Sequence, residues 1–414
     1  MKKIIAILMS ILVLLAGCTG SNSVEQKDNT LEKDWDSILE EASGTTVNFY
    51  MWGGDERINT WVDTYVADSM QEKYGVKVNM VPMGPDEYLN KLLGEKQVSR
   101  MEGSIDLVWI NGENFKTARQ ADLLWGPFAD KVPSYNKYID KEAPDVAYDF
   151  GYPVEGYEIP YGKAQFVFAY DSAKLENPPA TSEELLQWVK DNPGRFTYPE
   201  IPDFTGSVFL RHLMYELCGG YEAFPYTEEV DKEKLDVQLT PLWDYLNEMK
   251  EYMWRNGETY PSSVAALQQL FADGEIDISM TYHPSYMSGM ISQGLMPETV
   301  RTYVWDKGTI GNTHFLAIPF NAPNKSAALA LCDFLSSPEA QISKYVPENW
   351  GDMVALDINK MEPEYVEELK GIDTGIATLS SEILQNHRLP EISASYIPVI
   401  EELWKERIIQ REGQ

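Results

Sequence analysis

Short apolar runs with the composition of strands alternate along the chain with segments whose apolar residues recur at helical spacing. The run 46–52 is followed by a helical pattern over 58–70 and by a second strand over 76–81. A strand, a helix and a strand in that order are typical of a parallel sheet covered by helices. A buried strand over 106–110 extends the same predicted sheet.

The rest of the chain repeats this alternation. A second block starts with a strand over 166–170, and the pattern TSEE at Thr181 predicts a helix start through a capping box. Further predicted elements are a strand over 195–198, helices near 206–218, 240–255 and 265–272, a strand over 276–282, a strand over 315–319, a helix over 326–335, and two or three amphipathic helices over 364–409. Together these blocks favour two α/β lobes.

Polar clusters follow two of the buried strands. The strand in SIDLVWINGENF ends in Asn111, Gly112, Glu113 and Asn114, and the strand over 276–282 ends in the stretch Tyr282 to Tyr286. Ligands of open α/β sheets bind outside the carboxyl ends of the strands, whereas a polar turn is the other interpretation of each cluster. Because two blocks end strands in this way, a cleft between two lobes is favoured.

The N-terminus has the features of an export signal. Lys2 and Lys3 precede an apolar run over 4–15 that is too short to span a bilayer. The following Leu15-Ala16-Gly17-Cys18 resembles the bacterial lipobox, in which the cysteine is acylated, although an ordinary signal peptide with a chance cysteine is the alternative. We therefore expect a signal peptide over 1–17, a polar tether over 18–44, and a lipid anchor at Cys18 on the outer face of the cell membrane or its periplasmic side.

The formal net charge of −31 argues against nucleic acid and anionic lipid as partners. The same field draws cations towards a cleft, but solubility is the commoner reason for an acidic surface. Two further cysteines, Cys218 and Cys332, fall in segments that look helical, and a buried apolar role fits each better than a disulfide.

Several segments in sequence order resemble the extracellular solute-binding proteins of ABC importers, in the family-1 group with maltose-, polyamine-, thiamine- and iron-binding members. They are Tyr161 to Leu175 with the following PPATSEEL, LQQLFADGEIDISMTY, and AIPFNAPNKSAALALCDFLSSPEAQ. MWGGDERIN and LVWINGENF are similar more narrowly to the YnjB-like, thiamine-transport-like branch. The resemblance implies a type II periplasmic-binding-protein fold, with lobe 1 over 45–163 and 310–358, lobe 2 over 164–309 and 359–414, and a hinge of crossing strands near 161–169 and 311–319.

The resemblance also implies a monomer that delivers a small solute to a permease and an ATPase. Closure needs ligand groups from both lobes. The candidate ligand-binding residues are Trp52, Gly53, Gly54, Asp55, Asn111, Glu113 and Asn114 in lobe 1, Tyr161 and Lys163 in the hinge, Tyr282, His283, Ser285 and Tyr286 in lobe 2, and Trp350 and Tyr396 from the resemblance. Turn formation at the two glycines, a solvated Lys163 and a packed Trp350 are the structural alternatives.

Aromatic rings beside carboxylates suit a nitrogenous organic cation such as a thiamine-like compound or a polyamine. A sugar stacking on the same rings, or an anion at the helix start after the glycines, is an alternative ligand. From other classes, a secreted hydrolase lacks G-x-S-x-G and H-E-x-x-H, and a lipid-anchored receptor would keep the fold without binding a solute. The four histidines show no metal-ligand spacing, so neither a metal nor another cofactor is expected.

Overall fold

The first lobe is built around a mixed sheet in the order β11-β10-β3-β1-β2, with β6 also pairing with β10. The structure is a computed structural model and describes residues 28–409, so the predicted signal peptide, Cys18 and the start of the tether lie outside the described residues. The strands are β1 (Thr46–Met51), β2 (Lys77–Pro82), β3 (Leu107–Ile110), β6 (Glu158–Gln165), β10 (Thr309–Ala317) and β11 (Arg388–Leu389). The parallel pairing of β1 with β2 and β3 is as predicted, whereas β10 runs antiparallel to β3 and β6.

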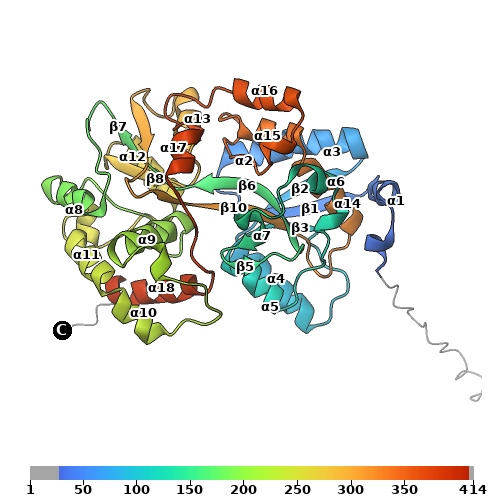
Figure 1. Ribbon diagram of the computed structural model, residues 1–414, viewed down its shortest axis with the longest axis horizontal. Coiled ribbons are helices and arrows are strands. Elements are labelled where there is room, and N and C mark those ends of the chain that lie inside the picture. Colours follow the sequence, from blue (N-terminus) through green and yellow to red (C-terminus); the bar gives the residue numbers. More distant parts are fainter. Residues whose placement is uncertain (1–27, 410–414) are drawn as a thin grey trace, which may run out of the picture.

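Helices cover both faces of this sheet (Figure 1). They are α1 (Trp35–Ala42), α2 (Glu56–Trp61), α3 (Ala67–Tyr74), α4 (Pro85–Gln97), α5 (Glu113–Gln120), α6 (Pro133–Tyr138), α7 (Pro144–Ala147), α14 (Lys325–Leu335), α15 (Pro338–Tyr345) and α16 (Pro363–Gly371), with a small hairpin of β4 (Tyr148–Asp149) and β5 (Tyr152–Pro153). Buried apolar residues from β1, α2, α14 and α15 form one continuous core.

The second lobe contains a smaller antiparallel sheet in the order β8-β7-β9. Its elements are β7 (Val167–Asp171), β8 (Ile278–Thr281), β9 (Val300–Tyr303), α8 (Ser182–Asp191), α9 (Phe204–Leu217), α10 (Lys232–Gln238), α11 (Thr240–Lys250), α12 (Val264–Ala272), α13 (Tyr286–Ser292), α17 (Ser381–Asn386) and α18 (Tyr396–Trp404). The predicted capping box opens α8, because the Thr181 hydroxyl accepts from Glu184 N and the Glu184 carboxylate accepts from Ala180 N. A separate apolar core fills this lobe.

Two long strands connect the lobes. β6 continues into β7 of the second sheet, and β9 of the second sheet is followed by β10. The chain therefore passes between the lobes in β6 and again in β10, and these two strands pair antiparallel. In Figure 1 these strands lie between the half that contains α8 to α12 and the half that contains α1 to α7. The predicted fold class, two α/β lobes with a hinge of crossing strands, is the one observed.

Some predicted boundaries need correction. The predicted tether extends to residue 44, but α1 packs on α14 through Ile38 and Ala42, both buried, so the fold begins earlier. The predicted start of the last lobe 2 segment at 359 is too early, because α16 packs on α15 in the first lobe. The expected strand over 195–198 is not one; instead of pairing with a strand, Arg195 O accepts from Asp277 N and Phe196 O accepts from Trp254 N.

The described residues also settle two smaller points. Cys218 and Cys332 are both free, and they lie in different lobes. Within residues 28–409, no helix is both long and apolar enough to cross a membrane.

Candidate binding site

A cavity of about 490 Å³ lies between the two lobes. Its walls come from the loops after β1 and β3 in the first lobe, from the starts of α9, α12 and α13 in the second, and from the connecting strands β6 and β10. The predicted candidates that line it are Trp52, Gly54, Asp55, Asn111, Glu113, Asn114, Tyr282, His283 and Tyr286. The fold therefore brings polar groups from two distant parts of the chain to one space.

Trp52 presents an aromatic surface to the cavity. Its side chain is 37% exposed and meets the Trp109 ring edge-on, with the centroids 6.4 Å apart. Gly54 permits this position, because a Cβ atom there would lie 2.2 Å from the Trp52 indole. Gly54 therefore allows the Trp52 ring to lie close to the backbone, in addition to any role in a turn.

Asp55 lines the cavity but already has a strong partner. Its carboxylate caps α2 by accepting from Arg57 N and pairs with Arg57 Nη2 at 2.7 Å. Burial raises the pKa of the Asp55 carboxyl, yet the hydrogen bonds and charge of Arg57 outweigh it and hold the pKa below its usual range. Because Asp55 accepts from Arg57 N and places its own carboxylate at this helix start, the alternative of an anion bound there is disfavoured.

Glu113 begins α5 and faces the cavity beside Asn114, whose Nδ2 donates to Glu113 Oε1 at 3.1 Å. Burial raises the pKa of the Glu113 carboxyl to about 7. A carboxyl group with this pKa exchanges its proton near neutral pH, and a bound cation would favour its charged form.

The second lobe adds two carboxylates that sequence reasoning missed. Asp203 caps α9 by accepting from Thr205 N and Gly206 N, and it also accepts from Val264 N at the start of α12. Glu401, on α18, accepts from Ser207 Oγ at 2.6 Å, while burial raises the pKa of the Glu401 carboxyl. Both line the cavity.

The connecting strand β10 contributes Asn312 and His314 to the cavity wall. Asn312 is only 5% exposed, and neither its Oδ1 nor its Nδ2 has a hydrogen-bond partner among the described residues. A buried amide in that state is costly, since folding removes its water without replacing the hydrogen bonds. A solute in the cavity would supply them.

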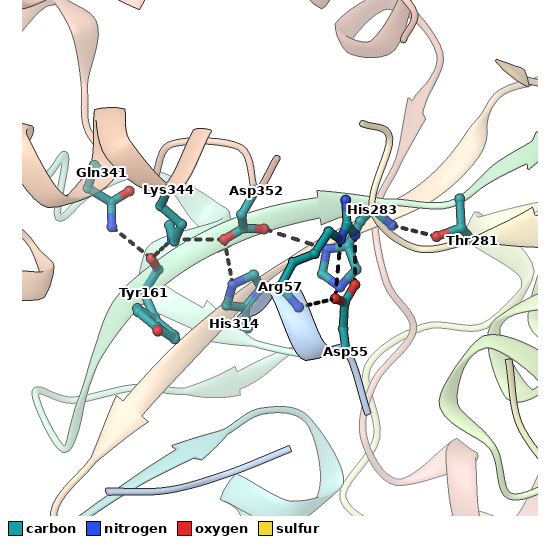
Figure 2. A network of polar contacts seen from close by, with 9 residues as sticks. All are labelled: Asp55, Arg57, Tyr161, Thr281, His283, His314, Gln341, Lys344 and Asp352. Carbon is teal, nitrogen blue, oxygen red and sulfur yellow. Dashed lines mark hydrogen bonds and ion pairs between the residues drawn. The ribbon is translucent and has the colours of Figure 1, made fainter. Parts of the chain in front are cut away.

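Behind this wall lies a buried network of charged groups, shown in Figure 2. Asp352 pairs with Lys344 at 2.8 Å and with His314 Nε2 at 2.8 Å. The side chains of Asp352 and Lys344 are both fully buried. His283, from the second lobe, approaches the other Asp352 oxygen at 3.8 Å. Burial opposes ionisation of Asp352, but the charges of His314 and Lys344 hold the pKa of this carboxyl far below its usual range.

Six candidates do not line the cavity. Tyr161 and Trp350 are fully buried, and their rings pack against each other at 5.3 Å behind it. Lys163 pairs with Asp145 at 2.8 Å. The remaining three are Gly53, which packs on Pro82, the buried Ser285, and Tyr396, whose hydroxyl donates to Pro225 O. Packing or a local partner accounts for each.

Residues missed by sequence reasoning are mostly on the second lobe and the hinge. They include Asp86, Trp109, Asp203, Phe204, Gln268, Asn312, His314 and Glu401. Trp109 lies in the buried strand whose end was predicted to face the cleft, so its position was within reach of the sequence. Asp203 and Glu401 had no such signal, because nothing local distinguishes an N-cap or a helical glutamate that faces a cleft from one that faces solvent.

The lining of the cavity is acidic. Among the residues that the structure describes, it is lined by five carboxylates and by no lysine or arginine; the five are Asp55, Asp86, Glu113, Asp203 and Glu401. Aromatic rings lie on both sides, Trp52 and Trp109 in the first lobe and Phe204, Tyr282 and Tyr286 in the second. Such a lining can hold a cation by charge and by its ring faces.

Residues 65–349 match the family described as bacterial extracellular solute-binding protein. The chain is also similar to protein YnjB of Escherichia coli (strain K12), with 36% identity over 343 residues that cover 82% of this chain and 87% of that protein. Both matches extend over the two lobes.

Solved structures of the same fold include the spermidine/putrescine ABC transporter substrate-binding protein PotD from Streptococcus pneumoniae. It has a TM-score of 0.58 and 16% identity, and the match covers 89% of this chain and 100% of that one. A periplasmic thiamin binding protein matches with a TM-score of 0.56 and 15% identity, covering 88% of this chain and 96% of the other. At these identities the likeness concerns the fold.

Proposed function

Because the chain belongs to the family of bacterial extracellular solute-binding proteins, and is the substrate-binding component of an ABC importer, we propose that its solute is a small nitrogenous organic cation. The observation that carries this proposal is the lining of the cavity, with five carboxylates, five aromatic rings and no lysine or arginine among the described residues. A cation replaces its water with carboxylates and ring faces there, whereas an anion would meet only repulsion.

Thiamine-like compounds and polyamines fit this description. The net charge of −31 supports the same choice, since a strongly acidic protein attracts cations from solution. The solutes named for the two solved structures, spermidine or putrescine and thiamin, are nitrogenous cations as well. A sugar could stack on the rings, but it would leave the carboxylates without a counter-charge.

We propose further that the protein is a monomer anchored by lipid at Cys18 on the outer face of the bacterial membrane, or on its periplasmic side. The support is the sequence Leu15-Ala16-Gly17-Cys18 after an apolar run. Replacing Cys18 by Ser is expected to release the protein from the membrane fraction. Retention of the Cys18→Ser protein in that fraction would contradict the anchor.

Native mass spectrometry of protein purified under mild conditions tests the proposed solute. We expect a mass increase from a basic organic compound, which liquid chromatography and fragmentation then identify. A thermal-shift series provides the comparison: thiamine and spermidine should raise the melting temperature, while glucose and glucose 6-phosphate should not. A copurifying sugar or organic acid would contradict the proposal.

A further inference from the structure

Glu113 and Glu401 are two of the carboxylates that line the cavity, one from each lobe. Glu113 begins α5 of the first lobe, and Glu401 lies on α18 of the second. Among the described residues neither forms an ion pair; each accepts one hydrogen bond through Oε1, from Asn114 and from Ser207. Both carboxylates line the same cavity, and the charge of Glu401 adds to the effect of burial in raising the pKa of Glu113.

The charged groups around the pair offset this repulsion only in part. Arg211 acts on both glutamates, but its guanidinium is held by Glu391 in two hydrogen bonds of 2.8 and 2.9 Å. Lys405, which is exposed, is the other cation that acts on Glu401. Other carboxylates add negative charge: Asp86 raises the pKa of Glu401, and Glu391 raises the pKa of Glu113. Glu113 in turn raises the pKa of Asp149.

Two unpartnered polar groups point independently to a ligand in the same cavity. The Tyr282 hydroxyl belongs to a side chain that is 6% exposed, and it has no hydrogen-bond partner among the described residues. The Asn312 amide is in the same condition. Tyr282 also meets the Phe204 ring edge-on at 5.0 Å, so an aromatic corner lies at the second-lobe wall. Most buried polar groups in folded proteins are hydrogen-bonded, and a solute in the cavity would supply the missing partners of these two.

We propose that Glu113 and Glu401 together bind an alkylammonium group of the solute, one carboxylate from each lobe, with the Phe204 and Tyr282 rings beside its carbon chain. This inference rests on the proposed function and assigns the cationic end of the solute to a position. Asp55, another carboxylate of the first-lobe wall, is neutralised by Arg57, so that the Trp52 side of the cavity takes the less polar part of the solute.

At the proposed site, closure of the two lobes is favoured by a bound cation. Without a solute, bringing the lobes together places two like charges in a poorly solvated space, so one carboxyl group keeps a proton. An ammonium group replaces that proton, which is released to solvent when the solute binds. Affinity should therefore increase as the pH rises towards 7 and level off above it, because protons no longer compete once Glu113 is ionised in the free protein.

n-Butylammonium is the probe for this site, with n-butanol and butyrate as neutral and anionic counterparts. NMR of the mature protein with glutamate labelled at the carboxyl carbon reports both side chains directly. We expect n-butylammonium to shift the Glu113 and Glu401 signals and to lower the apparent pKa of Glu113 by about one unit or more, while butanol and butyrate do neither. Absence of both responses at 50 mM probe would overturn the proposal.

Substitutions complete the test. Glu113→Gln and Glu401→Gln should each weaken n-butylammonium binding at least about tenfold, as expected for a lost charge-assisted hydrogen bond. Glu402→Gln is the matched control, since the adjacent residue pairs with Lys232 at the surface; its effect should be below about twofold. An equal loss in all three variants would contradict the site. The wild-type NMR titration decides the question even where a variant does not fold.

The outcomes separate this inference from the proposed function. If the copurifying solute is a cation and the two glutamates do not respond to n-butylammonium, the carboxylate pair is wrong while the proposed function stands. If the copurifying solute is a sugar and the glutamates respond, the ammonium site is supported and the cationic solute is contradicted.

Discussion

The polar residues of the cleft differ in whether they have a hydrogen-bond partner and a counter-charge. Among the described residues, the Asn312 amide has no hydrogen-bond partner and Glu113 has no counter-charge, whereas Asp55 has both in Arg57. The first two conditions are costly in the free protein and are relieved by a bound solute. The Asp55 pair with Arg57 instead stabilises the fold, so carboxylates of one cavity have different roles.

Asn312→Leu tests the cost of the unpartnered amide. Leucine has the same number and branching of heavy atoms and needs no hydrogen bonds, so we expect the free energy of unfolding to stay the same or to increase by up to about 1 kcal/mol. Affinity for the copurifying solute should fall about tenfold or more. Urea unfolding and calorimetry measure the two quantities. A destabilised variant with full affinity would show that the amide serves the fold.

Asp55→Asn should destabilise the protein, because it leaves the Arg57 guanidinium buried without its counter-charge. Breaking such a pair costs about 3–5 kcal/mol, and Asp55→Asn with Arg57→Gln should recover part of the loss. The pKa of Asp55 is lower in the fold than the ordinary 3.8, so the pair contributes fully above pH 4 and its contribution is lost as the pH falls through the folded-state value. Urea unfolding at pH 7 and pH 3 checks both the size and the pH dependence.

The paired strands β6 and β10 form the hinge and also position the buried charged network behind the cavity wall. Gly162 on β6 lies under the network of Figure 2, where a Cβ atom would be 1.8 Å from Asp352 Oδ2 and 2.4 Å from Lys344 Nζ. Opposite it in the register, His314 of β10 bonds to the same carboxylate. The strand pair thus leaves room for one buried ion pair directly behind the cavity wall.

Gly162→Ala should displace Asp352 from Lys344 and cost about 3–5 kcal/mol of unfolding free energy. Gly94→Ala is the control, because Gly94 lies within α4 and a Cβ atom added there would meet no other atom within 4 Å; alanine there should stabilise the helix by about 0.5–1 kcal/mol. Urea unfolding of both variants is the measurement. Equal stability of the Gly162→Ala protein would mean that the network can move without loss.

At the scale of the whole molecule, contacts already join the lobes across the cleft. The Arg57 guanidinium lies over the Tyr286 ring at 4.8 Å, and Lys116 Nζ donates to Ser395 Oγ at 2.7 Å. These contacts connect the first lobe to α13 and to the start of α18 in the second. A solute that touches both walls adds to them and favours the closed arrangement.

The overall charge should affect how fast the solute arrives. With a net charge of −31, the association rate of a cationic solute should fall by about tenfold or less between 10 mM and 500 mM salt, as screening shortens the reach of the field. Stopped-flow tryptophan fluorescence with the copurifying solute measures this rate, and Trp52 and Trp109 in the cavity wall are suitable reporters. A rate independent of salt would contradict electrostatic steering of a cation.

Sequence reasoning predicted the cavity residues of the first lobe more completely than those of the second. Trp52, Asn111 and Glu113 follow buried strands directly, and the carboxyl ends of parallel strands meet at one edge, so their convergence was predictable. Trp350 and Lys163 show the limit of this reasoning. Their places in the resemblance to solute-binding proteins suggested a role at the cleft, but packing on Trp109 and Tyr161 and a salt bridge to Asp145 direct these side chains elsewhere.

The sequence by itself determined the fold class, because the alternation of buried strands and amphipathic helices permits few arrangements, and it determined the acidic character of the chain. Only the tertiary structure decided which carboxylates face the cavity and which of them are already paired. Glu401 illustrates the reason, because a glutamate far along the chain enters the site only where α18 packs against the cavity. Such a relation depends on distances between elements, and local sequence does not encode it.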